Sequence, residues 1–471
     1  MASPIKFGTD GWRAVIGEEY TFANVRIVAQ AVADFLHTER LAERGLIVGY
    51  DTRFASERFA AACAEVLAAN GIHTYLTGKA TPTPVISYAI LDKTAGGAAI
   101  ITASHNPSSD NGFKYKPEYA GSASPTVIGK LEALLEANPV KRLNLADAER
   151  QGLVERIDAM PAYVQQITTL VDLDLIKRSG KTIIVDSMFG AGAGYLPTIL
   201  DGGATKIIPI NSERNPLFPG IRAPEPIDSN LAKLKKVVKE SGADVGIAFD
   251  GDADRVGLVD EKGRFINQLQ VFGLLAYYLL EVKGWRGPLV KSLSTTSMVS
   301  RLGELYNVPV FETPVGFKHI GPKMLETKAI IGGEESGGFA FDRHIPERDG
   351  ILASLFLIEF MLRRNKPPSQ LLEELFAKVG PHFYDRLDLT YPAEQRPAIL
   401  QRVADAHPET LGGQKVKHIS TEGGYKYVLE DGSWLLIRFS GTEPLLRVYT
   451  ETRSAGIVAQ LLDEGRKLAG M

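Results

Sequence analysis

Cysteine is almost absent from this chain of 471 residues, which contains a single one, Cys63. One cysteine cannot form an intramolecular disulfide, and its alanine-rich surroundings are typical of a small apolar helix residue rather than of a nucleophile. No uninterrupted apolar run approaches the ~18 residues of a membrane span, and the first residues lack the apolar core of a secretory signal. We therefore expect a soluble protein of a reducing compartment, the cytoplasm, with no membrane partner.

An excess of charge of one sign is also lacking, since 53 basic and 56 acidic residues give a formal net charge of −3. Binding of a polyanion by counterion release needs clustered positive charge, so this balance argues against a nucleic-acid partner. An apolar content of 44% and an ordinary glycine content exclude a disordered or fibrous chain. The length alone predicts roughly three domains.

What the sequence does contain is a pattern of strand, helix, strand and strand that recurs three times and indicates α/β architecture. The strands are expected at 46–50, 73–76 and 98–102, then at 182–186, 206–210 and 245–249, and finally at 288–290, 308–311 and 329–331. Each third strand leads directly into a polar loop. Because ligands of open α/β sheets bind at the carboxyl ends of strands, the three loops are expected to converge on a shared cleft.

The C-terminal part indicates a smaller α+β unit instead. Strands are predicted at 383–391, 425–429 and 434–439, with helices at 397–406 and 455–468, and the Asp431-Gly432 dipeptide predicts a hairpin turn. Two segments rich in proline and glycine, 107–124 and 212–226, are expected to be loops.

The second polar loop, Asp250-Gly-Asp-Ala-Asp254, carries three carboxylates at alternate positions, and such a turn can direct hard oxygen ligands at one cation. The spacing also begins like an EF-hand, with Glu261 at the twelfth position. That interpretation is disfavoured because Arg255 stands where the EF-hand needs glycine and because the flanking segments are predicted strands. A magnesium site is favoured over calcium binding or a solvated acidic turn.

The first polar loop contains Ser104, which follows a predicted buried strand and precedes His105-Asn-Pro107. Its hydroxyl is expected on a tight turn, exposed in a loop. No Gly-x-Ser-x-Gly elbow or third triad member accompanies it, so acyl transfer is disfavoured. By itself Ser104 is an ordinary turn residue, but beside a metal loop it becomes a candidate acceptor for a phosphoryl group.

Two further loops offer polar groups for ligands. In the segment 438–447, Arg438, Arg447, Ser440, Thr442 and the backbone around Gly441 form a candidate phosphate cradle, the alternative being a polar hairpin end with Arg–Glu pairing. The loop 333–338 presents carboxylate and hydroxyl groups on flexible backbone suited to sugar hydroxyls, although alone it is only a loop. The glycine run 190–194 does not have the spacing of a dinucleotide fingerprint.

Taken together and in this order, these four loops resemble the α-D-phosphohexomutase superfamily. The correspondence extends over Phe7-Gly-Thr-Asp-Gly-Trp-Arg13, Thr102-Ala-Ser-His-Asn-Pro107, Gly112-Phe-Lys-Tyr115, Asp250-Gly-Asp-Ala-Asp-Arg255, Val315-Gly-Phe-Lys-His319, Gly333-Glu-Glu-Ser-Gly337 and Arg438-Phe-Ser-Gly-Thr-Glu-Pro444. It covers essentially the whole chain. The resemblance implies three related mixed-sheet α/β domains and a C-terminal α+β domain around a central active-site cleft, here at 1–150, 151–262, 263–378 and 379–471.

The resemblance also implies a role for each matching residue. Ser104 would be the phosphoserine and, with Asp250, Asp252 and Asp254, a ligand of Mg²⁺; Lys114, His319, Arg13 and Arg255 would be catalytic; Glu334 and Ser336 would contact sugar hydroxyls; Arg438, Ser440, Gly441, Thr442 and Arg447 would hold the phosphate that is not transferred. His319 stands where relatives carry various residues.

The reaction implied by the resemblance interconverts hexose 1-phosphate and hexose 6-phosphate through phosphoserine and a 1,6-bisphosphate, with glucose 1,6-bisphosphate as activator. A glutamate at position 335 is similar to phosphoglucomutases at the matching position. This resemblance favours glucose phosphates as substrates, with mannose phosphates second. The alternatives are a phosphoglucosamine mutase, a sugar-1,6-bisphosphate synthase and, more remotely, a non-catalytic phosphosugar-binding regulator. Hexose phosphates are the expected partners, and the chain is expected to be a monomer or a homodimer.

Overall fold

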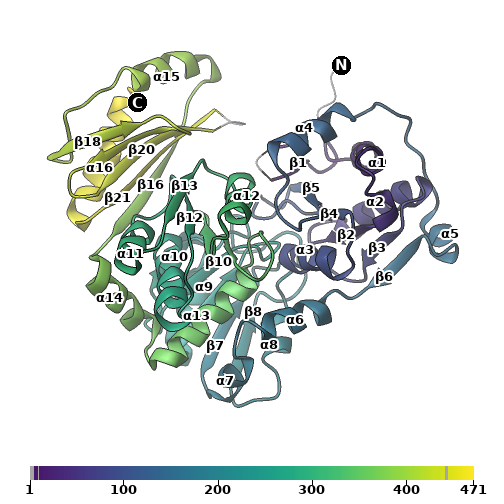
Figure 1. The fold of residues 1–471 in the computed structure, drawn as a ribbon, viewed down its shortest axis with the longest axis horizontal. Helices are drawn as coiled ribbons and strands as arrows, with labels where there is room; N and C mark the ends of the chain where they lie inside the picture. Colours follow the sequence, from purple (N-terminus) through teal and green to yellow (C-terminus); the bar gives the residue numbers. More distant parts are fainter. Residues whose placement is uncertain (1–4, 9, 441–443) are drawn as a thin grey trace.

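The computed structural model describes residues 5–8, 10–440 and 444–471. They form four β-sheets with helices packed on them, arranged along the chain in the order of the colours of Figure 1. Three of the sheets mix parallel and antiparallel strands, and the fourth is antiparallel throughout. Within the described part of the chain, no helix is long and apolar enough to cross a membrane.

The first sheet has the strand order β1-β5-β4-β2-β3-β6. Its elements are β1 (Trp12–Val15), α1 (Phe22–Thr38), η1 (Ala42–Arg44), β2 (Leu46–Tyr50), α2 (Ser56–Ala69), β3 (Thr74–Thr77), α3 (Thr83–Asp92), β4 (Gly97–Ile101), β5 (Asp110–Pro117), α4 (Pro125–Ala133), α5 (Leu145–Arg150) and β6 (Val154–Ile157).

The second sheet has the order β11-β10-β9-β7-β8. Its elements are α6 (Met160–Thr168), α7 (Leu173–Arg178), β7 (Thr182–Asp186), α8 (Tyr195–Ile199), β8 (Lys206–Ile210), η2 (Asp228–Asn230), α9 (Ala232–Ser241), β9 (Val245–Phe249), β10 (Val256–Val259) and β11 (Phe265–Ile266).

The third sheet has the order β13-β12-β14-β15. Its elements are α10 (Gln268–Tyr277), η3 (Tyr278–Val282), β12 (Leu289–Ser292), α11 (Met298–Tyr306), β13 (Val310–Thr313), α12 (Phe317–Thr327), β14 (Ile331–Gly333), β15 (Phe339–Phe341), α13 (Gly350–Arg364) and α14 (Pro368–Val379).

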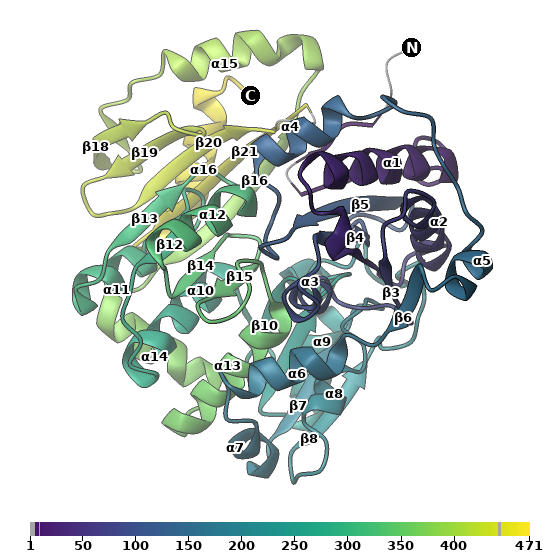
Figure 2. The same ribbon diagram turned by 45° about the vertical axis from the view of Figure 1, so that its right-hand side comes forward.

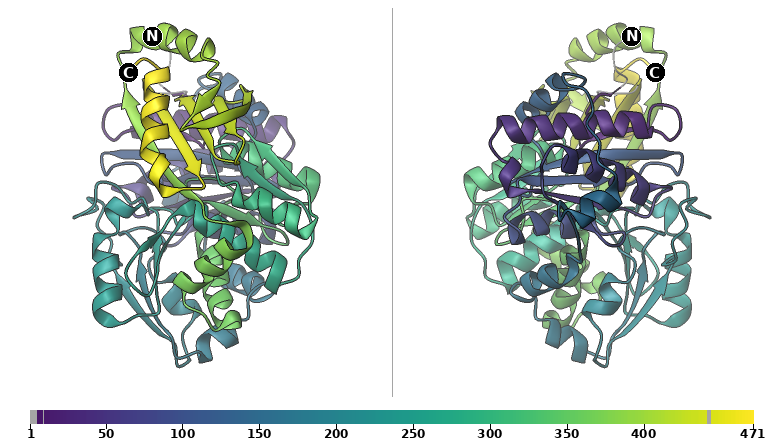
Figure 3. Two further views of the ribbon diagram at one scale, coloured as in Figure 1. Left: turned by 90° about the vertical axis from the view of Figure 1, so that its left-hand side faces the viewer. Right: turned by 90° about the vertical axis from the view of Figure 1, so that its right-hand side faces the viewer.

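The fourth sheet has the order β16-β21-β20-β19-β18-β17, and α16 lies along one of its faces (Figure 3, left). Its elements are β16 (Phe383–Thr390), η4 (Ala393–Gln395), α15 (Arg396–Ala404), β17 (Thr410–Leu411), β18 (Gln414–Ser420), β19 (Tyr425–Leu429), β20 (Trp434–Phe439), β21 (Leu445–Thr452), η5 (Ala455–Ile457) and α16 (Val458–Leu468).

The first three sheets share one topology, which confirms the threefold pattern read from the sequence. In each, the first strand of the pattern is central, with the second and third strands parallel to it on either side: β3-β2-β4, β8-β7-β9 and β13-β12-β14. The next strand then returns antiparallel to the third, as β5, β10 or β15. Each polar loop therefore occupies the same topological position, the connection after the third strand.

Helices cover both faces of the first sheet, as Figure 2 shows for α1 and α3. Strand β2 is buried along its whole length, because its alternate side chains enter two different clusters. Leu46 and Val48 pack with residues of α1 and α2, whereas Ile47 packs with residues of α3. Rigid packing on both faces fixes the strand ends that carry the loops.

One loop prediction is wrong. Residues 110–117 were expected within a loop because of their proline and glycine neighbours, but they form β5, which pairs with β4 on one side and β1 on the other. Segment 212–226 does lack helix and strand, as predicted. Strand β6, which follows residue 150, completes the edge of the first sheet beside β3.

The fourth domain contacts the third through a mixed apolar and charged interface. Leu293 packs in a cluster with Trp434 and Leu436. Beside it, the buried Lys426 donates to the Leu293 carbonyl over 2.7 Å and to the Glu312 carboxylate over 2.9 Å. Burial and the neighbouring Lys291 lower the pKa of Lys426 to about 8, against the opposing attraction of Glu312.

Candidate active site

The loop after β4 (residues 102–107, the serine loop) and the loop after β9 (residues 250–254, the metal loop) lie against each other through their main chains. A Cβ atom on Gly251 of the metal loop would lie 2.4 Å from the carbonyl oxygen of Ser104, so only glycine fits at this close approach. The side chain of Arg53 holds the serine loop from the other side, because it donates to the carbonyls of Ser104 and Asn106, each over 2.6 Å. Main-chain contact therefore sets the separation of the two loops.

Ser104 lies on a tight turn, as predicted, with a φ of +51°, a conformation that L residues adopt rarely. The expectation that its hydroxyl is exposed is wrong, because the residue is fully buried. The cause is the neighbouring metal loop: Oγ of Ser104 donates to Oδ2 of Asp250 over 2.7 Å. His105 lies next to the hydroxyl, and burial together with nearby cationic groups lowers the pKa of its imidazole well below the usual value.

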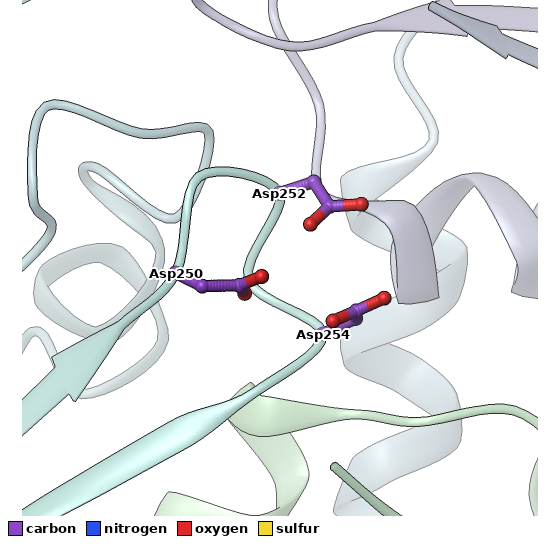
Figure 4. A group of neighbouring side chains, drawn as sticks. All are labelled: Asp250, Asp252 and Asp254. Carbon is purple, nitrogen blue, oxygen red and sulfur yellow. The ribbon is translucent and has the colours of Figure 1, made fainter. Parts of the chain in front are cut away.

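The three aspartates of the metal loop converge, as Figure 4 shows. Each offers a carboxylate oxygen within 4.8 Å of the others, and all three residues are fully buried. The loop connects β9 and β10, so the strand–loop–strand context predicted against an EF-hand is confirmed.

The carboxylates of the metal loop fit a divalent cation. Among the described residues, Oδ1 of Asp252 and Oδ1 of Asp254 are buried and accept no hydrogen bond. Burial and the repulsion of Asp254 and Asp252 raise the pKa of Asp250 well above its usual value. Buried, unsatisfied carboxylate oxygens are costly unless they coordinate a cation, and carboxylates are the ligands that Mg²⁺ prefers.

Lys114 lies on β5, and its ammonium group contacts this cluster directly. Nζ lies 2.8 Å from Oδ2 of Asp252, 3.2 Å from Oδ2 of Asp254 and 2.8 Å from Oδ2 of Asp10. Burial alone would lower the pKa of Lys114, but the three carboxylates raise it, so the side chain is a firmly held cation. Thr83 donates to the same Asp252 oxygen over 2.6 Å.

The sugar-binding candidates Glu334 and Ser336 belong to the loop 333–338 (the sugar loop), which lies beside the metal loop. Ser336 donates to Oε1 of Glu334 over 2.7 Å, and burial raises the pKa of Glu334. The two loops are tied by main-chain contacts, since Val256 donates to the carbonyl of Gly337 over 3.1 Å. The adjacent Glu335 accepts from Ser294 over 2.6 Å and thereby anchors the loop near the end of β12.

The two further arginines of the predicted set also lie at this junction. Nε of Arg255 lies 3.8 Å from Oδ1 of Asp254, and Nη1 lies 3.5 Å from Glu225. Arg13, on β1, donates to Oδ1 of Asn106 in the serine loop over 2.6 Å. His319, on the first turn of α12, makes no side-chain hydrogen bond or ion pair with the metal, serine or sugar loops in the described part of the chain.

The described phosphate-binding candidates, Arg438, Ser440 and Arg447, lie on or next to strands β20 and β21. Arg438 and Arg447 are directly paired across these strands, and Asp388 of β16 is paired with Arg447 on its other side. The described residues include Ser440 but not Gly441 or Thr442, which lie outside them. The Asp388 carboxylate lies 3.7 Å from Nε of Arg447 and 3.0 Å from Nε of Arg386.

Arg386, Arg438 and Arg447 lie on the same face of the fourth sheet as Tyr449, which packs in a cluster with Leu293 of the third domain. Burial and the Glu335 carboxylate raise the pKa of the Tyr449 hydroxyl, while Arg447, Arg438 and Arg386 lower it, so groups of both loops act on one side chain. The site therefore combines a buried acidic cluster, a hydroxyl and a lysine at one end with a row of arginines at the other. Such an arrangement can hold a ligand with two phosphate positions.

Sequence reasoning missed three arginines of this site: Arg53, Arg348 and Arg386. Arg348 bridges the metal loop and the sugar loop, with Nη2 3.0 Å from Oδ2 of Asp254 and Nη1 3.3 Å from Oε1 of Glu334. The signal that could have indicated Arg348 is the neighbouring Asp349, whose side chain caps the N-terminus of α13 by accepting from the Leu352 N–H over 2.8 Å. Residue 348 therefore lies directly before the first turn of that helix. Arg53 and Arg386 lie in segments whose sequence carries no such signal.

The fold is that of phosphohexose mutases, and the chain belongs to the phosphoglucomutase/phosphomannomutase family, within the α-D-phosphohexomutase superfamily. Models of that family match its α/β/α domain I at residues 4–141, domain II at 161–263, domain III at 267–379 and the C-terminal domain at 389–468. It is an intramolecular phosphotransferase, as its relatives are.

The relatives agree on the family and differ in their sugar. A phosphoglucomutase/phosphomannomutase of Thermococcus kodakarensis is 33% identical, with 98% of each chain covered. A phosphoglucosamine/phosphogalactosamine mutase of Sulfurisphaera tokodaii is 29% identical, again with 98% of each chain covered. A crystal structure from Thermus thermophilus, provisionally assigned as a phosphomannomutase, is 37% identical and covers 100% of both chains with a TM-score of 0.88.

Proposed function

We propose that this protein interconverts hexose 1-phosphate and hexose 6-phosphate by carrying the transferred phosphoryl group on Ser104. One observation carries the proposal: Oγ of Ser104 lies in hydrogen-bond contact with the buried three-aspartate cluster. A hydroxyl held against buried carboxylates, two of whose oxygens accept no hydrogen bond from the described residues, is suited to store a phosphoryl group whose charge a cation neutralises.

The residues of the site suit each part of this reaction. The phosphoryl group passes from Oγ of Ser104 to the free hydroxyl of the hexose phosphate: a general base takes the proton of the attacking hydroxyl as the new O–P bond forms, and a general acid protonates Oγ as its bond to phosphorus breaks. The resulting hexose 1,6-bisphosphate turns round and returns its other phosphoryl group to Ser104. Lys114, fixed beside Asp252, offers positive charge to the transferring group.

The site accounts for binding in two opposite orientations. The row of Arg438 and Arg447 would hold whichever phosphate is not being transferred, and Glu334 and Ser336 would accept and donate hydrogen bonds to sugar hydroxyls. Asp250, Asp252 and Asp254 would hold Mg²⁺, which supplies charge neutralisation for the transferring phosphoryl group when bound.

For the sugar, we propose glucose phosphates first and mannose phosphates second, with glucose 1,6-bisphosphate as the activator. The support is the Glu334-Glu335-Ser336 run, which resembles phosphoglucomutases. A phosphoglucosamine mutase is the second candidate, and the Sulfurisphaera tokodaii relative named for glucosamine and galactosamine favours it.

Parallel kinetics on glucose, mannose and glucosamine 1-phosphates, each with catalytic 1,6-bisphosphate and Mg²⁺, test these proposals. We expect the 6-phosphate as product, fastest with glucose, and a purified protein whose intact mass shows one added phosphate. Release of stoichiometric free phosphate without 6-phosphate would indicate a phosphatase. Accumulation of bisphosphate from a separate phosphoryl donor would indicate a synthase.

A further inference from the structure

A second buried lysine lies behind the proposed site. Lys116 follows Lys114 by two residues on β5, so both side chains project from the same face of the strand. Its Nζ lies 3.0 Å from Oδ1 of Asp10 and 2.5 Å from Oε2 of Glu347. Both Lys116 and Glu347 are fully buried. Asp10 is shared, because its other oxygen contacts Lys114.

Glu347 uses both of its oxygens. Oε2 accepts from Lys116 and, over 2.7 Å, from the hydroxyl of Ser122. Oε1 accepts from the backbone N–H and from Nε of Arg348, each over 3.0 Å. Two groups of the first domain therefore hold the carboxylate, and the carboxylate holds the base of the Arg348 guanidinium.

The far end of that guanidinium lies between two loops of the site. Nη2 contacts Asp254 of the metal loop together with Asp10, and Nη1 contacts Glu334 of the sugar loop. The Arg348 side chain is nearly fully buried and lies over the ring of Phe317. Its orientation thus depends on partners at both ends, and Glu347 supplies those at the base.

An apolar pair of similar size would fill this space without the cost of burying two charges. Replacing buried ion pairs by apolar residues is often neutral or stabilising, so stability alone is a weak reason for the pair. The Lys116–Glu347 pair differs from an apolar pair because it fixes the orientation of the Arg348 guanidinium. This planar group has several donors and contacts one residue of the metal loop and one of the sugar loop.

We propose that Lys116 and Glu347 are positioning residues, which hold Arg348 in the geometry that aligns Asp254 for the metal and Glu334 for the sugar. Among the described residues, neither makes a hydrogen bond with Ser104 or with the three aspartates of the metal loop. The kinetic part of this inference rests on the proposed function, whereas its metal-binding part does not.

The variant Glu347→Gln tests this with two measurements. Calorimetric titration of the folded variant with Mg²⁺ should give a dissociation constant raised at least threefold, because Asp254 loses its fixed partner. Steady-state kinetics should give a KM for the hexose phosphate raised at least fivefold, because Glu334 loses its contact with a firmly held Arg348. Lys116→Met should shift both quantities in the same direction.

Glu359→Gln is the matched control. Glu359 is as fully buried as Glu347 and pairs with Lys283 at 3.0 Å, but its ion-pair partners, Lys283 and Arg363, form no ion pair with the metal loop or the sugar loop among the described residues. It should lower the melting temperature while leaving the Mg²⁺ dissociation constant and KM unchanged.

A lowered melting temperature in Glu347→Gln with an unchanged dissociation constant and KM would overturn the inference, since the pair would then be structural only. If that variant does not fold, Ser122→Ala decides, because it removes one donor to Glu347: a twofold rise in the dissociation constant supports the inference, and no change overturns it. A parent protein inactive on every hexose phosphate would refute the proposed function, and the Mg²⁺ titration would still decide this inference.

Discussion

Oγ of Ser104 and Oδ2 of Asp250 are joined by a hydrogen bond of 2.7 Å that links the loops of two different sheets. We expect Ser104→Ala to lower kcat by roughly 1,000-fold or more, because the alanine cannot carry a phosphoryl group. The free energy of unfolding should change by only about 1 kcal/mol, the worth of one hydrogen bond. Coupled-enzyme kinetics and chemical denaturation measure the two effects.

Intact-mass measurement gives an independent check of the same variant. Incubation with glucose 1,6-bisphosphate should add one phosphate to the parent and none to Ser104→Ala. The control is Ser354→Ala, which removes another buried serine hydroxyl, on α13. This variant should keep both the mass shift and the activity. A phosphate on the Ser104→Ala protein would place the carrier elsewhere.

Asp252→Asn should weaken Mg²⁺ binding and lower kcat by at least roughly 100-fold, because it removes one of three anionic ligands. Chelation of divalent ions should abolish the activity of the parent, and added Mg²⁺ should restore it. Asp260→Asn serves as a control, since Asp260 is equally buried but is paired with Arg264 beyond β10. Calorimetric Mg²⁺ affinity equal to that of the parent in Asp252→Asn would refute the metal assignment.

Arg447→Ala should act on binding more than on turnover. Loss of a charged hydrogen-bond donor to a phosphate is expected to raise KM roughly 10- to 100-fold while kcat falls less. Asp388→Asn should raise KM by a smaller factor, because Asp388 orients Arg447 and Arg386. Arg402→Ala, in the same domain, removes an arginine whose side chain donates to the carbonyls of Ala469 and Gly470 near the chain end, and it should leave KM unchanged. A normal KM in Arg447→Ala would contradict the cradle.

The Lys426 ammonium at the interface of the third and fourth domains predicts a pH effect on stability. Its pKa of about 8 in the folded protein is below the 10.5 of an unperturbed lysine. Between these values the unfolded chain binds the extra proton, so this group makes stability rise with pH from about 8 to 10.5. The gain is on the order of 1 kcal/mol per pH unit.

Urea unfolding of the parent and of Lys426→Met at several pH values tests this. The difference in the free energy of unfolding, parent minus variant, should increase as the pH rises through that window. A difference that is flat or that falls with pH would show that Lys426 is not held as a disfavoured cation.

Local patterns predicted the strands that form the scaffold. The segments 182–186, 206–210 and 245–249 coincide with β7, β8 and β9, because runs of β-branched residues bounded by polar ones are typical of strands. β7 and β9 are buried, whereas β8 lies at the edge of the sheet and is largely exposed. The polar loops were predictable because each directly follows the third predicted strand of a repeat.

Features that depend on distant partners were not predictable in this way. Strand β5 was taken for a loop because its stability comes from pairing with β4 and β1 rather than from its own composition. Ser104 was expected to be exposed, but a loop 146 residues further along the chain covers it. The roles of Arg53 and Arg348 likewise arise from contacts with residues of other domains or loops.

The close approach of Gly251 to the carbonyl of Ser104 has a consequence for how the site can be altered. The gap between phosphoryl carrier and cation ligands is set by two main chains in van der Waals contact, which no rotamer change can adjust. A single added methyl group, as in Gly251→Ala, would wedge the two loops apart and lengthen that gap while leaving every reacting side chain intact. Tolerance to substitution at this junction should therefore be lowest at a residue that carries no functional group at all.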